Sequence, residues 1–353
     1  MELIRGLHNL RPRHRGSVVT IGNFDGVHRG HQAILDQLKA HARAHDLPAV
    51  VVVFEPQPRE YFSGDQAPPR LTRLSDKVRL LGQYGADRVL CLPFNRRLRE
   101  LSAREFVDRV LIQGLGVRHL VVGDDFRFGC DRAGDFDLLK TLGEQAGFSV
   151  EHTRTFQTGG ERVSSTRVRT LLASGNFEQA EQLLGRPFSL EGRVVKDRQL
   201  GRTIGVPTAN LPMLPGPLIL RGVMAAMTRL EDGREVPGVL NIGWRPTVGA
   251  DRPVLEVHLF DLDESLYGQR LIVMPCARLR GEETFASVDE LKRRIHLDID
   301  QARDYFQQHA FQQHASDGPG ASPDAEGVDA SLPSCRYPMA SAPLAAERSK
   351  HEQ

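Results

Sequence analysis

Glycine and histidine residues gather at positions 22–31, which read Gly-Asn-Phe-Asp-Gly-Val-His-Arg-Gly-His. An apolar run at 18–21 precedes this motif, and a helical pattern follows it. A strand, a glycine turn and a helix start bring unpaired backbone N–H groups and the helix dipole to one point, which favours phosphate. Histidines there can contact charge that develops on a phosphate. The motif is neither a P-loop nor a dinucleotide fingerprint. It predicts nucleotide phosphate binding, with a structural turn as the alternative.

Three further segments of the first half carry polar side chains at the end of a predicted strand or the start of a predicted helix. They are Phe-Glu-Pro-Gln-Pro at 54–58, Gly-Asp-Asp-Phe-Arg-Phe-Gly at 123–129 and Ser-Ser-Thr-Arg-Val-Arg at 164–169. The last offers hydroxyls, backbone N–H groups and an arginine to phosphate oxygens. Taken singly, an ordinary loop, stacked core aromatics and a plain helix cap are the respective alternatives for these segments.

The second half contains a loop rich in glycine, hydroxyl and amide groups at residues 200–210. Thr208 and Asn210 alternate onto one side of it, as in a strand or an extended turn. Two neutral oxygen ligands suit a Mg²⁺ ion carried by a nucleotide. Glu256 lies on the polar face of a predicted strand at 254–260, where a carboxylate is usually only solvated.

Short apolar runs alternate with capped helical patterns from residue 15 to about 155, which predicts a parallel sheet covered on both faces. The predicted strands are 18–21, 49–54, 89–92, 119–123 and 148–152. The predicted helices start at Ser75, Ser102, Ser164 and Asn176 and end near Gly85, Gly114, Gly175 and Gly185. Ligands of such sheets bind at the carboxyl ends of the strands, where the motif at 22–31 lies.

Strand patterns replace helical ones from residue 188 to about 280, and around six strands with glycine and proline turns predict a small antiparallel barrel. Among them are 192–195, 223–229, 236–242, 254–260 and 271–278. A capping box at 287–290 starts a long helix expected to end at about Phe306. We expect domains at 1–186 and 187–310. Residues 311–353 are rich in Ala, Ser, Pro and Gly and are expected to form a disordered tail.

The length of 353 residues favours two domains, and 46 basic against 45 acidic residues give a net charge of +1. This balance does not favour nucleic acid or membrane partners. The four cysteines are scattered and form neither a disulfide framework nor a zinc motif. Residues 1–5 lack the apolar core of a signal peptide, and no run reaches membrane-spanning length. We expect a cytoplasmic protein with small-molecule substrates, and the oligomeric state stays open.

The ordered motifs from residue 15 to 306 resemble the bacterial bifunctional riboflavin kinase/FMN adenylyltransferases, or FAD synthetases. The resemblance rests on the segments already described together with Asn-Ile-Gly-Trp-Arg-Pro-Thr at 241–247 and Leu-Glu-Val-His-Leu at 255–259. It implies a Rossmann-like nucleotidyltransferase domain followed by a riboflavin kinase-like barrel with a terminal helix. Such an enzyme phosphorylates riboflavin to FMN and adenylylates FMN to FAD, with ATP as co-substrate and Mg²⁺.

The resemblance also assigns site residues. The positions that match the ATP site of the adenylyltransferase are Gly22, Phe24, Asp25, His28, His31, Ser165, Thr166 and Arg169. The positions on its flavin side are Pro56, Gln57, Pro58, Asp125 and Phe126. His28 and His31 are the implied catalytic residues there, and no protein nucleophile is needed. In the kinase half, Gly201 and Gly205 match the ATP loop, Thr208 and Asn210 match the Mg-ATP ligands, and Glu256 matches the catalytic base.

Five changes, one of them in a residue pair, depart from the family pattern. Gln57 stands for a histidine, Lys196-Asp197 for His-Gly, Val206 for an aromatic residue, Met224 for a tyrosine and Trp244 for a threonine. Four of these changes lie in the kinase half, so an alternative is an enzyme that only adenylylates FMN, with a weakened or inactive kinase domain. The sequence also leaves open a non-catalytic flavin- or nucleotide-binding regulator and an adenylyltransferase that acts on a different substrate, such as phosphopantetheine.

Overall fold

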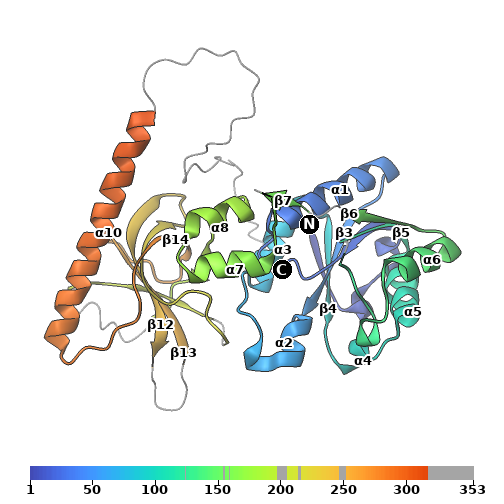
Figure 1. Cartoon of the computed structure of the whole chain (residues 1–353), viewed down its shortest axis with the longest axis horizontal. Coiled ribbons are helices and arrows are strands. Elements are labelled where there is room, and N and C mark those ends of the chain that lie inside the picture. Colours follow the sequence, from blue (N-terminus) through green and yellow to red (C-terminus); the bar gives the residue numbers. More distant parts are fainter. Residues whose placement is uncertain are drawn as a thin grey trace, which may run out of the picture.

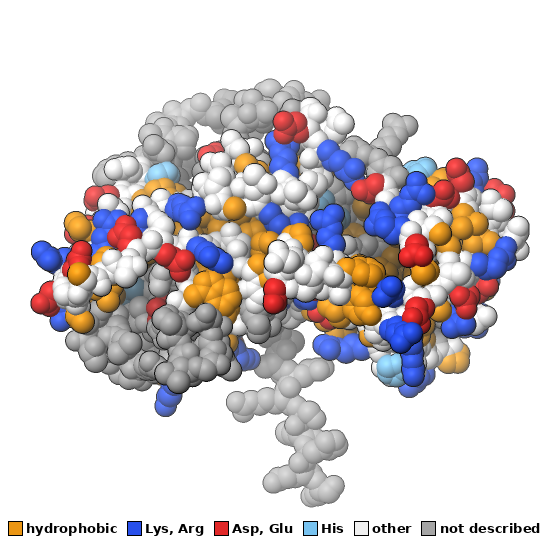
Figure 2. All heavy atoms as spheres, turned by 60° about the horizontal axis from the view of Figure 1, so that its bottom comes forward, with side chains coloured by type: hydrophobic (Ala, Val, Ile, Leu, Met, Phe, Trp, Pro, Cys, Tyr) orange, Lys and Arg blue, Asp and Glu red, His pale blue; other side chains and the backbone are white. Residues whose placement is uncertain are grey.

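A computed structural model describes residues 1–123, 125–153, 156–158, 160–196, 205–213, 216–245 and 252–316. They form two six-stranded sheets and a two-stranded ribbon of β7 (Gln157–Thr158) and β8 (Glu161–Arg162). Figure 1 shows the first sheet on one side of the molecule and the second sheet on the other, with helices α7 and α8 between them. Basic and acidic side chains are interspersed over the face in Figure 2, in keeping with the balanced charge. In the described residues no helix is both long and apolar enough to cross a lipid bilayer.

The first sheet is parallel throughout, as predicted, and its strand order is β1-β4-β3-β2-β5-β6. The strands are β1 (Glu2–Arg5), β2 (Ser17–Ile21), β3 (Ala49–Glu55), β4 (Arg88–Pro93), β5 (Val117–Gly123) and β6 (Ser149–Thr153). The chain runs outward from β2 to β3 and β4, and β5 then returns to the other side of β2. The crevice at the carboxyl ends of β2 and β5 is therefore a topological switch point, where ligands bind in such folds.

Helices cover both faces of this sheet. They are α1 (Arg29–His45), α2 (Pro58–Ser63), α3 (Leu74–Gln83), α4 (Arg96–Arg99), α5 (Ala103–Phe106), the π-helical segment η4 (Val107–Leu115) and α6 (Phe136–Ala146). Single-turn helices η1 (Leu7–Asn9), η2 (Pro12–His14), η3 (Gly64–Gln66) and η5 (Cys130–Arg132) lie in the loops. Val18 joins the core under α1 and α3, whereas Val19 joins the core under η4 and α6, because successive strand residues point to opposite faces.

Two of the predicted helix boundaries in this half of the chain were wrong. The third helix begins after Arg73 rather than at Ser75, whose hydroxyl donates to the neighbouring Asp76 carboxylate instead of capping the helix. The helical segment that starts at Ser102, as predicted, passes through Gly114 and ends at Gly116, which adopts the left-handed conformation (φ 55°) that terminates helices.

The second sheet is antiparallel, in the order β10-β13-β12-β11-β14-β9. Its strands are β9 (Leu190–Arg193), β10 (Ala209–Pro212), β11 (Gly222–Arg229), β12 (Glu235–Arg245), β13 (Arg252–Leu259) and β14 (Arg270–Arg280). The Val195 N–H donates to the Asn210 carbonyl at 2.9 Å and links the two ends of the sheet, so that the predicted barrel is almost closed.

Helix α10 (Val288–Ser316) packs on the outside of the barrel through Ala302, which contacts a cluster containing Ala225 and Phe260. The helix was expected to end at about Phe306 but continues to Ser316, so residues 311–316 of the predicted tail are helical. Residues 317–353 of that tail lie outside the described part of the chain.

Helices α7 (Ser165–Ala173) and α8 (Phe177–Leu184) share one hydrophobic core with the barrel. Their buried Val168, Leu172 and Leu183 belong to the same cluster as barrel residues such as Leu240. Helix α3 makes a separate, charged contact with the barrel, since the buried Glu191 of β9 accepts hydrogen bonds from Arg79 of α3 and from Arg270 of β14. The predicted boundary at 185–187 follows α8 and stays a prediction.

Candidate active sites

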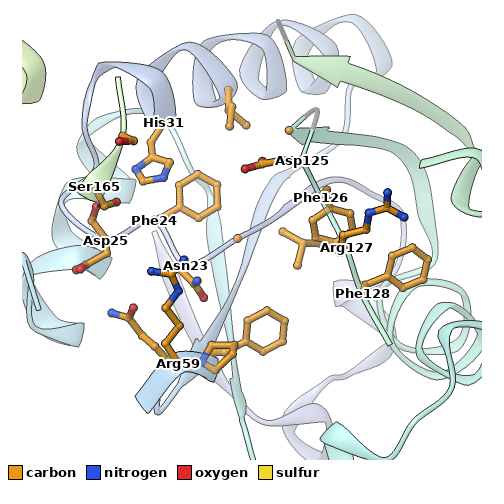
Figure 3. A pocket seen from close by; sticks show the side chains of 18 of the residues that line it. Asn23, Phe24, Asp25, His31, Arg59, Asp125, Phe126, Arg127, Phe128 and Ser165 are labelled. Atoms are coloured by element: carbon orange, nitrogen blue, oxygen red, sulfur yellow. The ribbon is translucent and has the colours of Figure 1, made fainter. Parts of the chain in front are cut away.

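A cavity of about 870 Å³ opens at the carboxyl ends of β2, β3 and β5 (Figure 3). Twelve of the thirteen positions assigned to the adenylyltransferase contribute to its wall: Gly22, Phe24, Asp25, His28, His31, Gln57, Pro58, Asp125, Phe126, Ser165, Thr166 and Arg169. Pro56 is not among the lining residues; it follows a cis peptide bond after Glu55. Four segments that are distant in the sequence therefore meet in one place, as expected for a single nucleotide site.

The turn between β2 and α1 has an unusual backbone. Phe24 (φ 46°) and Val27 (φ 40°) lie in the left-handed region, which is unfavourable for residues with a side chain and above all for a β-branched one. Other elements hold the turn in place, because Arg186 donates to the Gly26 carbonyl at 2.7 Å and Gln32 donates to the Val27 carbonyl at 2.9 Å. The strain and its support are typical of a functional site.

His28 and His31 lie at the start of α1 and stack on each other with 3.7 Å between ring centres. His28 is the N-cap residue, and its carbonyl and Nδ1 both accept from the His31 N–H. Burial lowers the pKa of His28 to about 4, and burial together with His28 lowers the pKa of His31 well below its usual value. Both rings are therefore neutral at neutral pH and can donate hydrogen bonds. His31 Nδ1 is buried with no hydrogen-bond partner, so it is available to a ligand oxygen.

A second helix start faces the same cavity. Ser164 caps α7 by accepting from the Arg167 N–H, while Ser165 and Thr166 at the first turn of the helix line the wall. The two helix N-termini come close, since a Cβ built on Gly30 of α1 would lie 3.4 Å from the Val163 carbonyl oxygen. Two dipoles and two sets of unpaired N–H groups therefore favour an anion in this space.

Asp25 is buried at the base of the cavity and joins its parts. The carboxylate accepts from the Leu71 and Thr72 N–H groups and from Arg169 Nη2 at 2.5 Å. The Ser165 hydroxyl donates to the Asp25 carbonyl at 2.9 Å. In this structure the Arg169 guanidinium, which was expected to contact phosphate, bonds Asp25 and the Pro69 carbonyl. These contacts give Asp25 an anchoring position, and its ATP contact stays a prediction.

Aromatic side chains form the opposite side of the cavity (Figure 3). Phe126 stacks with Phe128 at 5.6 Å between ring centres, and Asp125 is exposed and paired with Arg162. Gln57 is buried at the start of α2, and its Nε2 has no hydrogen-bond partner. Gln57, which stands where the family has a histidine, thus has an amide N–H that is free to donate a hydrogen bond.

Sequence reasoning missed several lining residues. Phe94 follows β4 and packs edge-to-face on Phe54 and Phe62, which forms a second aromatic group beside α2. Its position directly after a strand was the signal that could have identified it. Five further arginines line the cavity in addition to Arg169, and together they suit a polyanionic ligand: Arg59, Arg99, Arg127, Arg132 and Arg162.

The barrel carries the second predicted site on the outer, polar face of three neighbouring strands. Strand register places Asn210 of β10 and Asn241 of β12 directly opposite Glu256 of β13, one on each side. Asn210 Oδ1 is buried with no hydrogen-bond partner, and Thr208 precedes it by two residues. An unused amide oxygen beside a hydroxyl fits the oxygen ligands that Mg²⁺ takes. Gly205 adopts φ 79°, and a Cβ built on it would meet nothing within 4 Å; Gly201 lies outside the described residues.

The substituted positions of the barrel are accommodated differently. Val206 and Met224 are buried, and Met224 is part of the barrel core. The Arg221 guanidinium lies 6.0 Å from the centre of the Trp244 ring, and Lys196 Nζ lies 5.7 Å from the Tyr267 ring. Asp197 is outside the described residues. Val206 and Met224 are therefore packing residues, and Asn210 and Glu256 still lie opposite each other.

Family models match each half of the chain, and known proteins match both halves at once. The family model for FAD synthetase matches residues 10–167, and the one for riboflavin kinase matches residues 184–306. A bifunctional riboflavin kinase/FMN adenylyltransferase of Pseudomonas fluorescens is 54% identical over 304 residues, covering 86% of this chain and 97% of the relative. Its counterpart in Escherichia coli K12 is 50% identical over 307 residues, covering 87% and 98%. A crystal structure described as a macrolide-efflux protein of Streptococcus pneumoniae superimposes with a TM-score of 0.71 at 28% identity, covering 86% and 99%.

Proposed function

Since the chain belongs to the family of bifunctional riboflavin kinase/FMN adenylyltransferases, we propose that its two sites carry out the two steps of FAD synthesis. The barrel phosphorylates riboflavin to FMN with ATP, and the parallel-sheet domain adenylylates FMN to FAD. The observation that carries the adenylylation site is the meeting of two helix N-termini with His28 and His31 in one cavity. The barrel's match to riboflavin kinase favours two activities over the alternative of adenylylation alone.

Adenylylation needs no protein nucleophile. An oxygen of the FMN phosphate attacks the α-phosphorus of ATP, a new P–O bond forms, and pyrophosphate leaves. Catalysis then depends on orienting the two phosphates and stabilising charge on the transferring group. Neutral His28 and His31 suit this role as hydrogen-bond donors, and the first turns of α1 and α7 supply backbone N–H groups.

The flavin would occupy the aromatic side of the cavity. Phe126 and Phe128 offer ring faces to the isoalloxazine, and Asp125 lies at the rim beside them. Gln57 can donate its unused N–H to the flavin or its phosphate. Because an amide carries no titratable proton, Gln57 can orient a substrate but cannot protonate it.

Phosphorylation in the barrel requires a base and a nucleotide cradle. Glu256 would accept the proton of the riboflavin ribityl hydroxyl, whose oxygen attacks the γ-phosphorus while ADP leaves. Thr208 and Asn210 would hold Mg²⁺ with the nucleotide, and the bound ion supplies neutralisation of phosphate charge. Gly201 and Gly205 complete the proposed ATP loop. A cytoplasmic location is part of the proposal, because Cys91 and Cys130 are free thiols, typical of a reducing compartment.

The test is incubation of the purified protein with riboflavin and Mg-ATP, followed by separation of the flavins. We expect FMN and then FAD from riboflavin, and FAD from added FMN. Formation of FAD from FMN but of neither product from riboflavin would support the adenylyltransferase-only alternative. Binding of flavin and ATP without any product would support a regulator.

A further inference from the structure

Three histidines and a glutamate meet beside β5 and β6, away from both proposed active sites. His41 and His45 lie four residues apart on α1, His119 lies on β5 and Glu151 lies on β6. One ligand atom from each of the three histidines falls within 4.8 Å of the others. Because a helix rises about 1.5 Å per residue, His41 is roughly 15 Å along α1 from His31. The cluster is therefore separate from the phosphate cavity.

The contacts of His119 leave one of its ring nitrogens for a ligand. His119 is 6% exposed, and register pairs it with Ser149 on the neighbouring strand. The Ser149 hydroxyl donates to the Arg118 carbonyl at 3.5 Å and so can accept from His119 Nδ1–H at 2.6 Å. This bond leaves the lone pair on Nε2, which is buried without a hydrogen-bond partner and lies 3.4 Å from the Glu151 carboxylate.

The carboxylate is held in position from a second side. Glu151 Oε2 lies 2.7 Å from His41 Nε2, and Gln37 Nε2 donates to Glu151 Oε1 at 2.5 Å. The orientation of the Gln37 amide is fixed in turn, because the Thr153 hydroxyl donates to its oxygen at 3.0 Å. Groups that orient a ligand through a hydrogen bond are a regular part of metal sites in proteins.

We propose that His41, His45, His119 and Glu151 bind a divalent transition-metal ion of the Zn²⁺ type. Three imidazoles and one carboxylate are a ligand set that suits Zn²⁺ and that Mg²⁺, which prefers oxygen, does not favour. The ion would lie between His41 and Glu151 and take the place of their direct contact. His41 and His119 now stack at 3.9 Å between ring centres, and binding requires the His41 and His45 side chains to rotate toward Nε2 of His119.

The position of the site indicates a structural role. It would tie the last turns of α1 to β5 and to the edge strand β6, and a cation there also complements the negative end of the helix dipole. The other end of α1 carries His28 and His31, so the ion would fix the helix that presents both of them. The inference does not depend on the proposed function, because metal binding can be measured without any flavin.

The test uses the full chain without a histidine tag, first treated with a chelator and then titrated with Zn²⁺ or Co²⁺. We expect one equivalent to bind, visible Co²⁺ absorption bands of a low-symmetry four-coordinate site, and a higher Tm with Zn²⁺. His45→Ala removes an exposed ligand. Loss of a group that only supports a ligand weakens metal binding about 10- to 100-fold, so loss of the ligand itself should weaken Zn²⁺ binding at least as much. His119→Ala should do the same.

His8→Ala, at an exposed histidine outside the cluster, is the matched control and should bind Zn²⁺ as the unmodified chain does. Because His45 is exposed, its replacement leaves the core intact. Weaker Zn²⁺ binding by this variant therefore cannot be ascribed to unfolding. Failure of the chelator-treated chain to bind Zn²⁺ overturns the proposal. Binding of one equivalent that neither His45→Ala nor His119→Ala weakens overturns it as well.

Discussion

The Asp25 carboxylate and the Arg169 guanidinium form a hydrogen-bonded ion pair of 2.5 Å although 144 residues separate them in the chain. Their side chains are only 3% and 15% exposed. The pair connects the glycine turn after β2 with helix α7, and Asp25 also holds the Leu71 and Thr72 N–H groups. The two halves of the phosphate cavity are therefore fixed relative to each other by one carboxylate.

Replacing Asp25 by asparagine should strongly destabilise the protein. The substitution leaves Arg169 as a partly buried charge without its partner, a change that typically costs about 3–5 kcal/mol. Denaturant unfolding measures the loss. Asp125→Asn is the matched control, since that carboxylate lines the same cavity but is 70% exposed in its pair with Arg162, and exposed pairs contribute about 0–1 kcal/mol. Equal effects of the two variants would contradict the anchoring role of Asp25.

Stability should fall as the pH drops from about 6.5 to about 4. The pKa of His28 is about 4 in the folded chain against an ordinary value of 6.5, because burial disfavours the charged ring. In this interval the unfolded chain binds a proton at His28 that the folded chain does not, so protonation favours unfolding. This difference in the pKa of His28 corresponds to a loss of roughly 3 kcal/mol in the free energy of unfolding.

His28→Asn keeps a side-chain acceptor at the N-cap and removes this titration. The free energy of unfolding, measured at several pH values between 6.5 and 4, should therefore fall less steeply for His28→Asn than for the unmodified chain. The exposed His8→Asn should behave as the unmodified chain does. A variant at position 28 with an unchanged pH dependence would show that His28 is not buried as described.

His31→Ala should lower the formation of FAD from FMN by about 10²- to 10³-fold, the usual effect of losing one donor to developing charge. Phosphorylation of riboflavin should change little, since His31 lies in the other domain. The two reactions are measured separately, with FMN or riboflavin as the flavin substrate. His28→Ala should show the same pattern as His31→Ala. Equal loss of both activities would mean that the two sites do not work separately.

Glu256→Gln should reduce FMN formation from riboflavin by about 10²- to 10⁴-fold, because an amide cannot accept the ribityl proton. Conversion of added FMN to FAD should continue at its normal rate. Glu235→Gln on the neighbouring strand β12 is the control and should leave both rates unchanged, since Glu235 pairs with Arg229 rather than lying beside Asn210. Undiminished FMN formation by Glu256→Gln would assign the base to another group.

Local patterns predicted most of the fold. The apolar runs at β2 to β5 and the capping residues Ser102 and Ser164 have short-range causes that the sequence displays directly. Strand β1 was missed because only two of its four residues, Leu3 and Ile4, are apolar. The end of α10 was placed too early, although Gly318 and Pro319, which end helices, follow Ser316 and were the better signal.

The sites were predictable only in part. The glycine turn, the helix starts and the alternation of Thr208 with Asn210 are visible in short segments. The partner of Asp25, the position of Asn241 beside Glu256 and the meeting of His119 with His41 depend on tertiary contacts and strand register. Composition and spacing contain no information on such contacts between residues far apart in the chain.

Arg186, in the segment that joins α8 to the barrel, bonds to the carbonyl groups of Gly26 and Val27. The first family match ends at residue 167, before both Arg169 and Arg186. A fragment cut at that point would lose the partner of Asp25 and the support of the strained turn. The apolar sides of α7 and α8 belong to the barrel core. A barrel taken from a related enzyme must therefore match the apolar surface of these two helices to pack in this position.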